Sequence, residues 1–269
     1  MQIESMDDDL RNSLWSALQM CFWDKRYVQG RHHSTHYPDV ERLIRAFWLN
    51  FFKLPIDTIP SLTSDSINSI RVQFFNCAWN EVYDLIEFAA KSYRNETLSA
   101  EFRDTCNVFF QRENSAFRFV GVEIVQITTP EEIDSIESAT SSTIEGVRIH
   151  LTRALELLAD RKTPDFRNSI KESISAVECI CRQVAGEESA TLGAALKRIS
   201  DKEKVHPALE KAFSALYGYT NDSSGIRHAL LDQDTLTFTD AKFMLVTCSA
   251  FINYVLGKTA DLRMPLGPK

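Results

Sequence analysis

The sequence predicts a mainly α-helical protein, with an N-terminal helical domain that includes a small β-hairpin, followed by a C-terminal helical bundle. Three observations predict this fold class. Apolar residues recur at helical spacing along most of the chain, and apolar and polar residues alternate in a single stretch. Prolines and glycines stand where the helical patterns start and stop.

The length and composition fit a globular protein of this kind. A chain of 269 residues is long enough for about two domains. Its hydrophobic content of 44% and its charged content of 25% are ordinary for globular proteins, which excludes disordered and fibrous classes.

The first domain is predicted to span residues 1–143. Its apolar periodicity predicts helices at residues 7–22, 40–51, 64–88 and 99–113. Ser64 or Asp65 is expected to cap the third of these, which we expect to be one long helix. The aromatic stretch AFWLNFF in the second has helical spacing, which indicates core packing and not a platform for stacking bases.

The period changes at residues 116–128, where AFRFVGVEIVQIT alternates apolar and polar residues around Gly121. This pattern predicts a β-hairpin. A short helix is expected from Pro130, and it leads into a Ser/Thr run near residue 142, where we place the domain boundary.

The second domain is predicted to span residues 144–258, with a tail at 259–269. Helices are expected at residues 144–160, 165–185, 191–199, 206–218 and 239–256. The second of them carries an apolar stripe from Phe166 to Val184. Several antiparallel helices with short connections predict a bundle.

Charge divides the chain unevenly. Residues 1–143 hold 13 Lys and Arg against 21 Asp and Glu, whereas the chain from Ile144 onward holds 17 against 16. The acidic first part is a poor surface for nucleic acid, because binding to phosphates needs clustered Lys and Arg. The second part permits such binding.

The sequence favours a cytoplasmic protein that does not enter a membrane. It starts MQIESMDDDL, which has no pattern of a secretory signal. The apolar stretch from Phe243 to Leu256 is shorter than the roughly 20 residues that span a bilayer, so we expect a buried core helix.

The six cysteines are expected to be buried free thiols in a reducing compartment. Cys179 and Cys181 have no second ligand pair at zinc spacing, so we expect no metal and no cofactor.

The strongest candidate site is YGYTNDSSGIRHALLD, residues 217–232, which interrupts the helical pattern. Its polar run is expected to cap a helix that begins near Gly225, and the free N–H groups of such a helix start attract phosphate. The candidate phosphate-binding residues are Ser223, Ser224, Gly225 and Arg227.

His228 and Asp232 are four residues apart and would share one face of that helix. Asp232 could orient His228 and raise its pKa, which suits a general acid–base histidine. The alternative is an ordinary solvated helix start, in which Arg227 pairs with Asp222. The residues alone leave both interpretations open.

The same stretch resembles a known family when it is taken with its surroundings. The blocks DFRNSIKESISAVECICRQVAG and HPALEKAFSALYGYTNDSSGIRHALLD are similar to the C-terminal domains of the HEPN class (higher eukaryotes and prokaryotes nucleotide-binding). The blocks IESMDDDLRNSLWSAL and FFQRENSAFRFVGVEIVQITTPEEIDSIESA are similar to the N-terminal regions of AbiJ-type abortive-infection proteins.

The resemblance implies antiphage defence by a HEPN-like bundle that forms homodimers. In active members it implies metal-independent RNA cleavage, in which a ribose 2′-hydroxyl attacks the adjacent phosphate. In that chemistry a histidine transfers the protons, and an arginine stabilises the charged phosphorane. A protein trigger or partner could bind the N-terminal domain.

The family motif is an arginine, commonly followed by Asn, Asp or His, and then a histidine after four to six residues. The histidine of this motif falls on His228, and the polar position falls on Asn221 or Asp222. The motif arginine is missing, although Arg227 adjoins the histidine. The sequence therefore leaves two hypotheses: a ribonuclease or RNA-binding domain that uses His228, Arg227, Asp232 and Asn221, and a catalytically silent module that dimerises and binds a protein partner.

The spacing of that motif also occurs in RHHSTH, between Arg31 and His36, where we expect a solvated loop.

Overall fold

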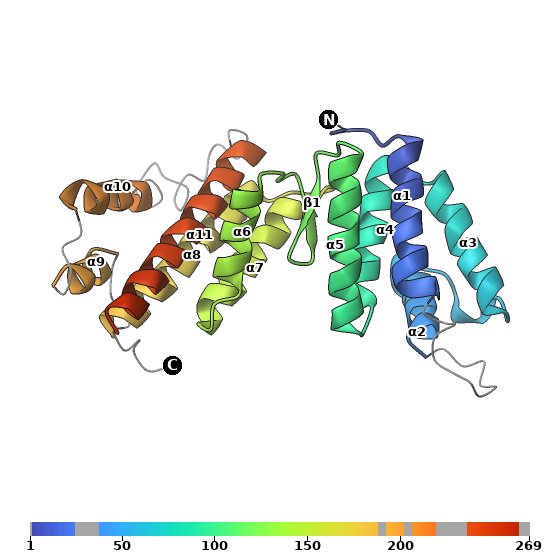
Figure 1. Cartoon of the computed structure of the whole chain (residues 1–269), viewed down its shortest axis with the longest axis horizontal. Coiled ribbons are helices and arrows are strands. Elements are labelled where there is room, and N and C mark those ends of the chain that lie inside the picture. The colour runs from blue at the N-terminus through green and yellow to red at the C-terminus, as the bar shows by residue number, and fades with distance from the viewer. Residues whose placement is uncertain (1, 25–37, 188–191, 202–205, 219–235, 264–269) are drawn as a thin grey trace. The chain divides into compact units, whose positions relative to one another are not determined.

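The computed structural model describes residues 2–24, 38–187, 192–201, 206–218 and 236–263 of the chain. These residues form eleven α-helices and one two-stranded hairpin (Figure 1). The predicted mainly α-helical fold class is therefore confirmed. The chain divides into two compact units, Met1–Thr128 and Thr129–Lys269.

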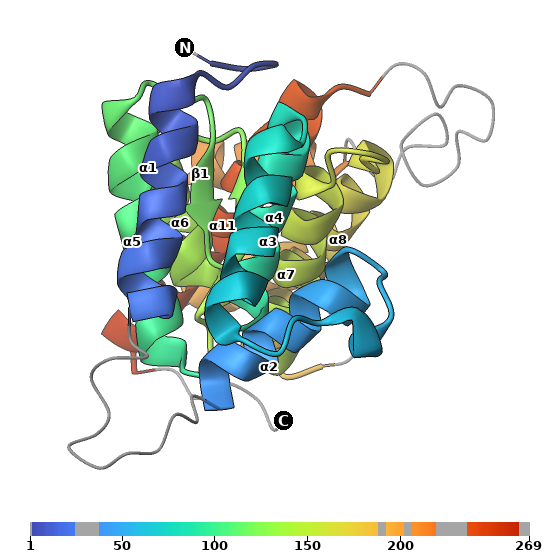
Figure 2. The ribbon, with the colours of Figure 1, turned by 90° about the vertical axis from the view of Figure 1, so that its right-hand side faces the viewer.

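The first unit packs its helices around an N-terminal one. Its described helices are α1 (Asp8–Leu18), α2 (Pro38–Ala46), α3 (Thr63–Asn76), α4 (Trp79–Ser92) and α5 (Glu96–Arg112). Short π-helical turns extend α1 to Trp23 and α2 to Phe51. Helix α1 contacts α3, α4 and α5, and Figure 2 shows it side by side with α5.

Aromatic side chains dominate the core of this unit. Phe22 stacks on Tyr93, with ring centroids 4.1 Å apart, and lies 4.5 Å from the ring of Phe102. Phe47 and Trp48 of the AFWLNFF stretch are buried, which confirms that this stretch belongs to the core. Burying each large ring contributes roughly 1.5–3 kcal/mol relative to leaving it exposed.

The predicted long helix at residues 64–88 is wrong, because two helices occupy this stretch. Cys77 and Ala78 have extended backbones between α3 and α4. Arg11 Nη1 donates hydrogen bonds to the carbonyls of Phe74, at 2.7 Å, and Cys77, at 3.0 Å, and these contacts satisfy the end of α3. Glu81 Oε2 accepts from the N–H of Ala78 at 2.9 Å at the start of α4.

The predicted cap of this segment is also wrong. Helix α3 begins at Thr63, and the residue before it, Leu62, makes no side-chain cap. Ser64 and Asp65 lie inside the first turn. The Leu62 carbonyl accepts from the N–H groups of Asp65 and Ser66 at 3.0 and 3.1 Å, so a side-chain acceptor is not what starts this helix.

The predicted hairpin is confirmed. Strands β1 (Arg118–Val120) and β2 (Glu123–Val125) pair antiparallel, with Phe119 opposite Ile124. Gly121 takes a φ of 58° at the first turn position, a conformation that costs glycine little and favours a tight two-residue hairpin.

The second unit is organised around its longest buried helices. Its described helices are α6 (Pro130–Thr140), α7 (Glu145–Ala159), α8 (Phe166–Ala185), α9 (Leu192–Ser200), α10 (Pro207–Gly218) and α11 (Phe238–Asp261). Helix α8 contacts α7, α9 and α11. Its predicted apolar stripe is buried from Ile170 to Val184, and Phe166 is half-buried.

Helix α6 packs on α11 within the second unit. Lys242 Nζ of α11 contacts Glu132 Oε2 at 2.8 Å, and Asn253 Nδ2 donates to the Ser135 carbonyl at 2.9 Å. The compact units therefore divide before α6. The functional domain boundary after residue 143 stays a prediction.

Helix α11 is longer than the predicted 239–256, because the chain remains helical from Phe238 to Asp261. Within the described residues it is the one helix that is long and apolar enough to cross a membrane by length and composition. Its buried side chains, including Met244, Leu245 and Ile252, belong to the core of the second unit, and a core helix meets the same criteria.

Candidate functional site

The residues predicted for catalysis and phosphate binding lie outside the described part of the chain. This applies to Asn221, Ser223, Ser224, Gly225, Arg227, His228 and Asp232, and to the stretch from Arg31 to His36. Their roles stay predictions. The structure instead describes the two segments that flank residues 219–235, one ending at Gly218 and the other beginning at Leu236.

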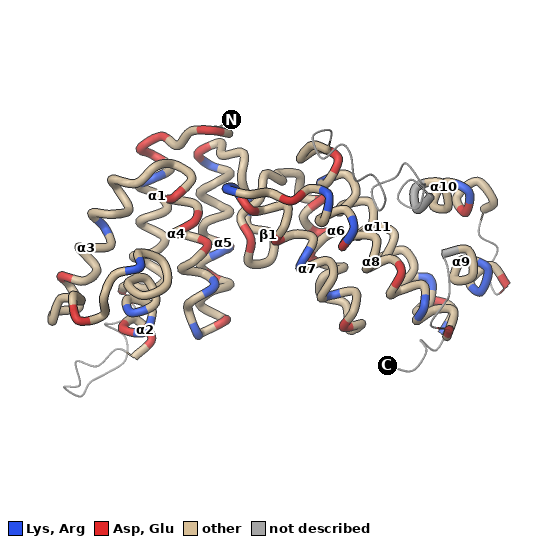
Figure 3. Tube along the Cα trace, turned by 180° about the vertical axis from the view of Figure 1, so that it is seen from behind, with Lys and Arg blue, Asp and Glu red and all other residues tan. Residues whose placement is uncertain are grey.

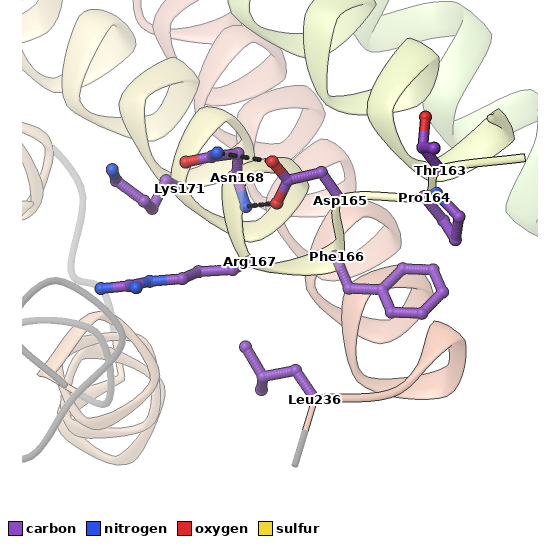
Figure 4. A pocket seen from close by; sticks show the side chains of 8 residues that line it. All are labelled: Thr163, Pro164, Asp165, Phe166, Arg167, Asn168, Lys171 and Leu236. Atoms are coloured by element: carbon purple, nitrogen blue, oxygen red, sulfur yellow. Dashed lines mark hydrogen bonds between the residues drawn. The ribbon is translucent and has the colours of Figure 1, made fainter. Parts of the chain in front are cut away.

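The segment that begins at Leu236 contributes to a pocket of about 500 Å³ in the second unit (Figure 4). The pocket surrounds the start of α8. Its described lining consists of Thr163, Pro164, Asp165, Phe166, Arg167, Asn168, Lys171 and Leu236. Leu236 follows Asp232 by four positions in the sequence, so the pocket includes a residue close in the chain to the predicted site.

The start of α8 is held by Asp165. Its Oδ1 accepts from the N–H of Asn168 at 2.9 Å, and its Oδ2 accepts from Asn168 Nδ2 at 2.6 Å (Figure 4). Asp165 is an N-cap residue that satisfies a free N–H of the first turn. Its two carboxylate oxygens are therefore engaged in fixing the helix start, which makes it a poor general base.

A second aspartate fixes the loop before α8. Asp160 Oδ1 accepts from the N–H groups of Lys162 and Thr163, each at 2.9 Å. The hydrogen bond from the Thr163 N–H is the largest of several contacts that lower the pKa of Asp160. This side of the pocket is consequently defined by a loop with a fixed conformation.

The pocket carries two cationic side chains on one helix. Arg167 and Lys171 are four residues apart on α8, and Figure 4 shows both pointing to the same side of the helix, away from Phe166. Because the positive end of the helix dipole lies at the same place, the pocket is suited to hold an anionic group such as a phosphate.

Leu236, two residues before α11, also lines the pocket. Phe238 packs edge-on against Phe166, with ring centroids 6.3 Å apart. Thr237 caps α11, since its Oγ1 accepts from the Asp240 N–H at 3.4 Å. In return, Asp240 Oδ2 accepts from the Thr237 hydroxyl at 2.6 Å and from the Thr237 N–H at 2.8 Å. These contacts position Leu236, whose side chain points toward the space between Phe166 and Arg167 in Figure 4.

Arg167 and Lys171 are not among the site residues predicted from the sequence. A signal for them was present, because Pro164 and Asp165 mark a helix start and two basic residues follow at helical spacing. No sequence pattern indicates that Leu236 lies beside them in the folded chain.

Basic residues elsewhere in the second unit do not form one uniform surface. Figure 3 shows Lys and Arg on α7, α8 and α9 next to acidic residues. Glu172 of α8 also contacts α7, where its Oε2 lies 2.6 Å from His150 Nδ1. The pocket at the start of α8 is therefore distinguished by its concave shape and not by charge alone.

The cysteines are poor candidates for nucleophiles. All six are free thiols, and burial raises the pKa of Cys181 and of Cys248 to about 12. The thiolate, which is the reactive form, is thereby disfavoured. The described residues also contain no group of three His, Cys, Asp or Glu side chains that could hold a metal ion.

The N-terminal part of the chain matches a known protein family. The family model of AbiJ N-terminal domain 4 matches residues 1–142, which is more than half of the chain. No curated protein and no solved structure matches. The AbiJ part of the resemblance is thus confirmed, whereas the HEPN-like part stays a prediction. The chain belongs to the family defined by AbiJ N-terminal domain 4.

Proposed function

We propose that this protein acts in the cytoplasm in antiphage defence of the abortive-infection type, and that its C-terminal domain is HEPN-like and acts on RNA as a homodimer. The observation that carries the defence role is the match of residues 1–142 to the AbiJ family. The RNA role is supported by the resemblance of the C-terminal sequence and by the cationic pocket at the start of α8.

In this proposal the pocket binds a backbone phosphate through Lys171, with Arg167 adding positive charge from the same helix. The ribose 2′-oxygen attacks the adjacent phosphorus, and the bond from phosphorus to the 5′-oxygen breaks. His228, oriented by Asp232, takes the 2′-hydroxyl proton and protonates the leaving 5′-oxygen. Arg227 stabilises the charged phosphorane. Ser223, Ser224 and Gly225 stay the predicted phosphate-binding residues beside Arg227.

The test is RNA decay without metal. The purified full-length protein is incubated with tRNA and mRNA in the presence of EDTA, beside His228→Ala and Arg227→Ala. The wild type is expected to cut RNA, and each variant is expected to lose at least about tenfold in rate. Equal decay in all three samples would remove these residues from catalysis.

The pocket has a separate test. Lys171→Ala is expected to weaken RNA binding several-fold and to reduce the dependence of the affinity on salt, because one phosphate contact is lost. Lys53→Ala in the first unit is the matched control and should leave binding unchanged. Unaltered binding by Lys171→Ala would exclude this pocket as the phosphate site.

A second candidate function is the catalytically silent module that binds a protein partner. The first unit contains a pocket of about 360 Å³ between α2, the turn Ile56–Thr58 and the start of α3. Ile44 and Ile59 line it, and Leu54, Ile56 and Leu62 are exposed large apolar side chains in the same segment. Apolar side chains beside a pocket are typical of protein-binding surfaces.

A phage challenge separates the two functions. If defence requires RNA cleavage, His228→Ala should abolish protection while Ile56→Asp retains RNA decay in vitro. If the silent module is correct, His228→Ala protects cells as the wild type does, and Ile56→Asp does not. Sedimentation of both variants checks that the oligomeric state is unchanged.

A further inference from the structure

Three ionisable side chains meet between α4 and the hairpin, apart from both pockets. Lys91 Nζ of α4 lies 3.0 Å from Glu87 Oε1 on the same helix and 2.6 Å from Glu123 Oε1 on β2. The side chain of Glu123 is only 6% exposed, and that of Glu87 is 15% exposed. Glu87 Oε2 also accepts from the N–H of Ile124 at 2.8 Å. Glu87 and Lys91 of α4 therefore both contact β2.

The charges of this cluster do not balance when every group is ionised. One ammonium group faces two carboxylates, which leaves a net negative charge in a largely buried place, and such a charge is costly. Burial, and then the neighbouring Glu87 carboxylate, raise the pKa of Glu123 from 4.5 to about 7. One proton on Glu123 makes the cluster neutral.

Lys91 remains the positive member. Burial alone would lower its pKa, but Glu87 and Glu123 together outweigh burial and raise it. Glu123 is therefore the member of the cluster that titrates near neutral pH.

Two polar side chains near the hairpin make contacts outside the cluster. Arg118 of β1 stands opposite Val125, and its Nη1 donates to the carbonyls of Ser115 and Phe117. Asn107 of α5 is neutral and pairs with the backbone of Phe119. The pKa of Glu123 is shifted by burial, by Glu87 and by Lys91.

We propose that Glu87, Lys91 and Glu123 form a proton-sensitive latch, which holds β2 on α4 while Glu123 carries a proton and loosens when Glu123 is ionised. The hairpin is the last element of the first unit, which ends at Thr128. Its attachment to α4 therefore weakens as the pH rises toward neutrality. This inference does not depend on the proposed RNA function.

The direction of the effect follows from proton binding. Between pH 4.5 and 7 the folded state holds more protons on Glu123 than the unfolded chain does, so attachment weakens as the pH rises through this range. A single proton changes the opening equilibrium by at most about tenfold per pH unit.

Hydrogen exchange of the full-length protein tests the latch. Exchange of the peptide covering residues 118–125 is measured from pH 5.5 to 8.5 and corrected for the intrinsic rate at each pH. In the wild type, protection should fall several-fold as the pH rises. Glu123→Gln keeps an acceptor for Lys91 but cannot ionise, so its protection should be independent of pH.

Glu96→Gln is the matched control, because Glu96 pairs with Arg103 at an exposed site and should leave the pH dependence intact. An equal slope in Glu123→Gln, or a flat profile in the wild type, would overturn the latch. If Glu123→Gln fails to fold, carbon NMR of the wild-type carboxyl groups decides: a Glu123 midpoint near 7 supports the latch, and a midpoint near 4.5 refutes it.

Discussion

At the scale of single residues, side chains that reach between distant segments fix positions that the backbone leaves open. Gln2 is one example. Its backbone pairs with the chain after α5, because its N–H donates to the Asn114 carbonyl at 3.0 Å and its carbonyl accepts from the Ala116 N–H at 3.0 Å. Its amide group adds three further hydrogen bonds to Asp7 and Glu113.

We expect Gln2→Ala to lower the free energy of unfolding of the first unit by about 1–3 kcal/mol, since the three side-chain bonds are lost while the backbone pairing remains. Urea unfolding followed by circular dichroism measures this change. Asn68→Ala on the exposed face of α3 is the control, with an expected change within about 0.5 kcal/mol. A Gln2→Ala protein as stable as this control would contradict the role of the amide.

Two buried serines of the second unit should respond in opposite directions. Ser249 Oγ of α11 is buried with no hydrogen-bond partner among the described residues, whereas Ser169 Oγ donates to the Ala154 carbonyl at 2.8 Å. Ser249→Ala should raise stability by about 1 kcal/mol, because an unsatisfied hydroxyl is removed. Ser169→Ala should lower stability by a similar amount, because the carbonyl of Ala154 loses its donor. Thermal unfolding of both variants measures these changes, and a lower midpoint for Ser249→Ala or a higher one for Ser169→Ala would contradict them.

At the scale of elements, the contact between α7 and α8 depends on a small residue. A Cβ atom on Gly146 of α7 would stand 2.9 Å from Cys179 Sγ of α8 and 3.5 Å from Cys179 Cβ. The first distance is too short for an ordinary contact, and the second is not. Gly146 thus allows the two helices to approach closely at the cost of lower helix propensity.

A double-mutant cycle tests this contact. Gly146→Ala alone should change stability little or reduce it, because the gain in helix propensity is offset by the clash with Sγ. In a Cys179→Ala background the same change should raise the free energy of unfolding by up to about 1 kcal/mol. If the two changes are additive in urea unfolding, the close approach does not limit this position.

The elements also show where local patterns stop being sufficient. Periodicity predicted one helix across residues 64–88, but the chain breaks at Cys77 and Ala78 without a proline or glycine. The break is stabilised by Arg11, which comes from α1 and satisfies carbonyls at the end of α3. Since the partner lies more than sixty residues away, no local pattern could reveal it.

At the scale of the whole molecule, the pH response combines groups of opposite sign. Hydrogen bonds from Thr163 lower the pKa of Asp160, and hydrogen bonds from Thr237 lower the pKa of Asp240. Stability from these two groups is present above their unfolded pKa values and is lost as the pH falls through their folded ones. Glu123 acts in the opposite direction between pH 4.5 and 7.

Acid unfolding therefore provides a prediction for the second unit. Below about pH 4 the wild type should lose stability as Asp160 and Asp240 are protonated. Asp240→Asn cannot ionise, so it should be less stable than the wild type at pH 7 and should lose less on acidification to pH 3. An unchanged acid dependence of the midpoint of unfolding would show that this cap does not contribute to acid sensitivity.

The sequence by itself determined most helices, the hairpin and the family. Helical spacing, prolines and the Gly121 turn are local signals, because they depend on a chain's own backbone geometry. The match to the AbiJ family likewise depends on residues 1–142 alone. The candidate motif around His228 came from sequence as well, and its role stays a prediction.

Only the tertiary structure decided which distant residues meet. It placed Leu236 beside Arg167 and Lys171, joined Glu123 to a lysine 32 positions earlier, and grouped α6 with α11. Such contacts form between segments whose separation in sequence carries no periodic signal. Their energies arise from burial and charge in the folded chain, which is why composition and spacing could not predict them.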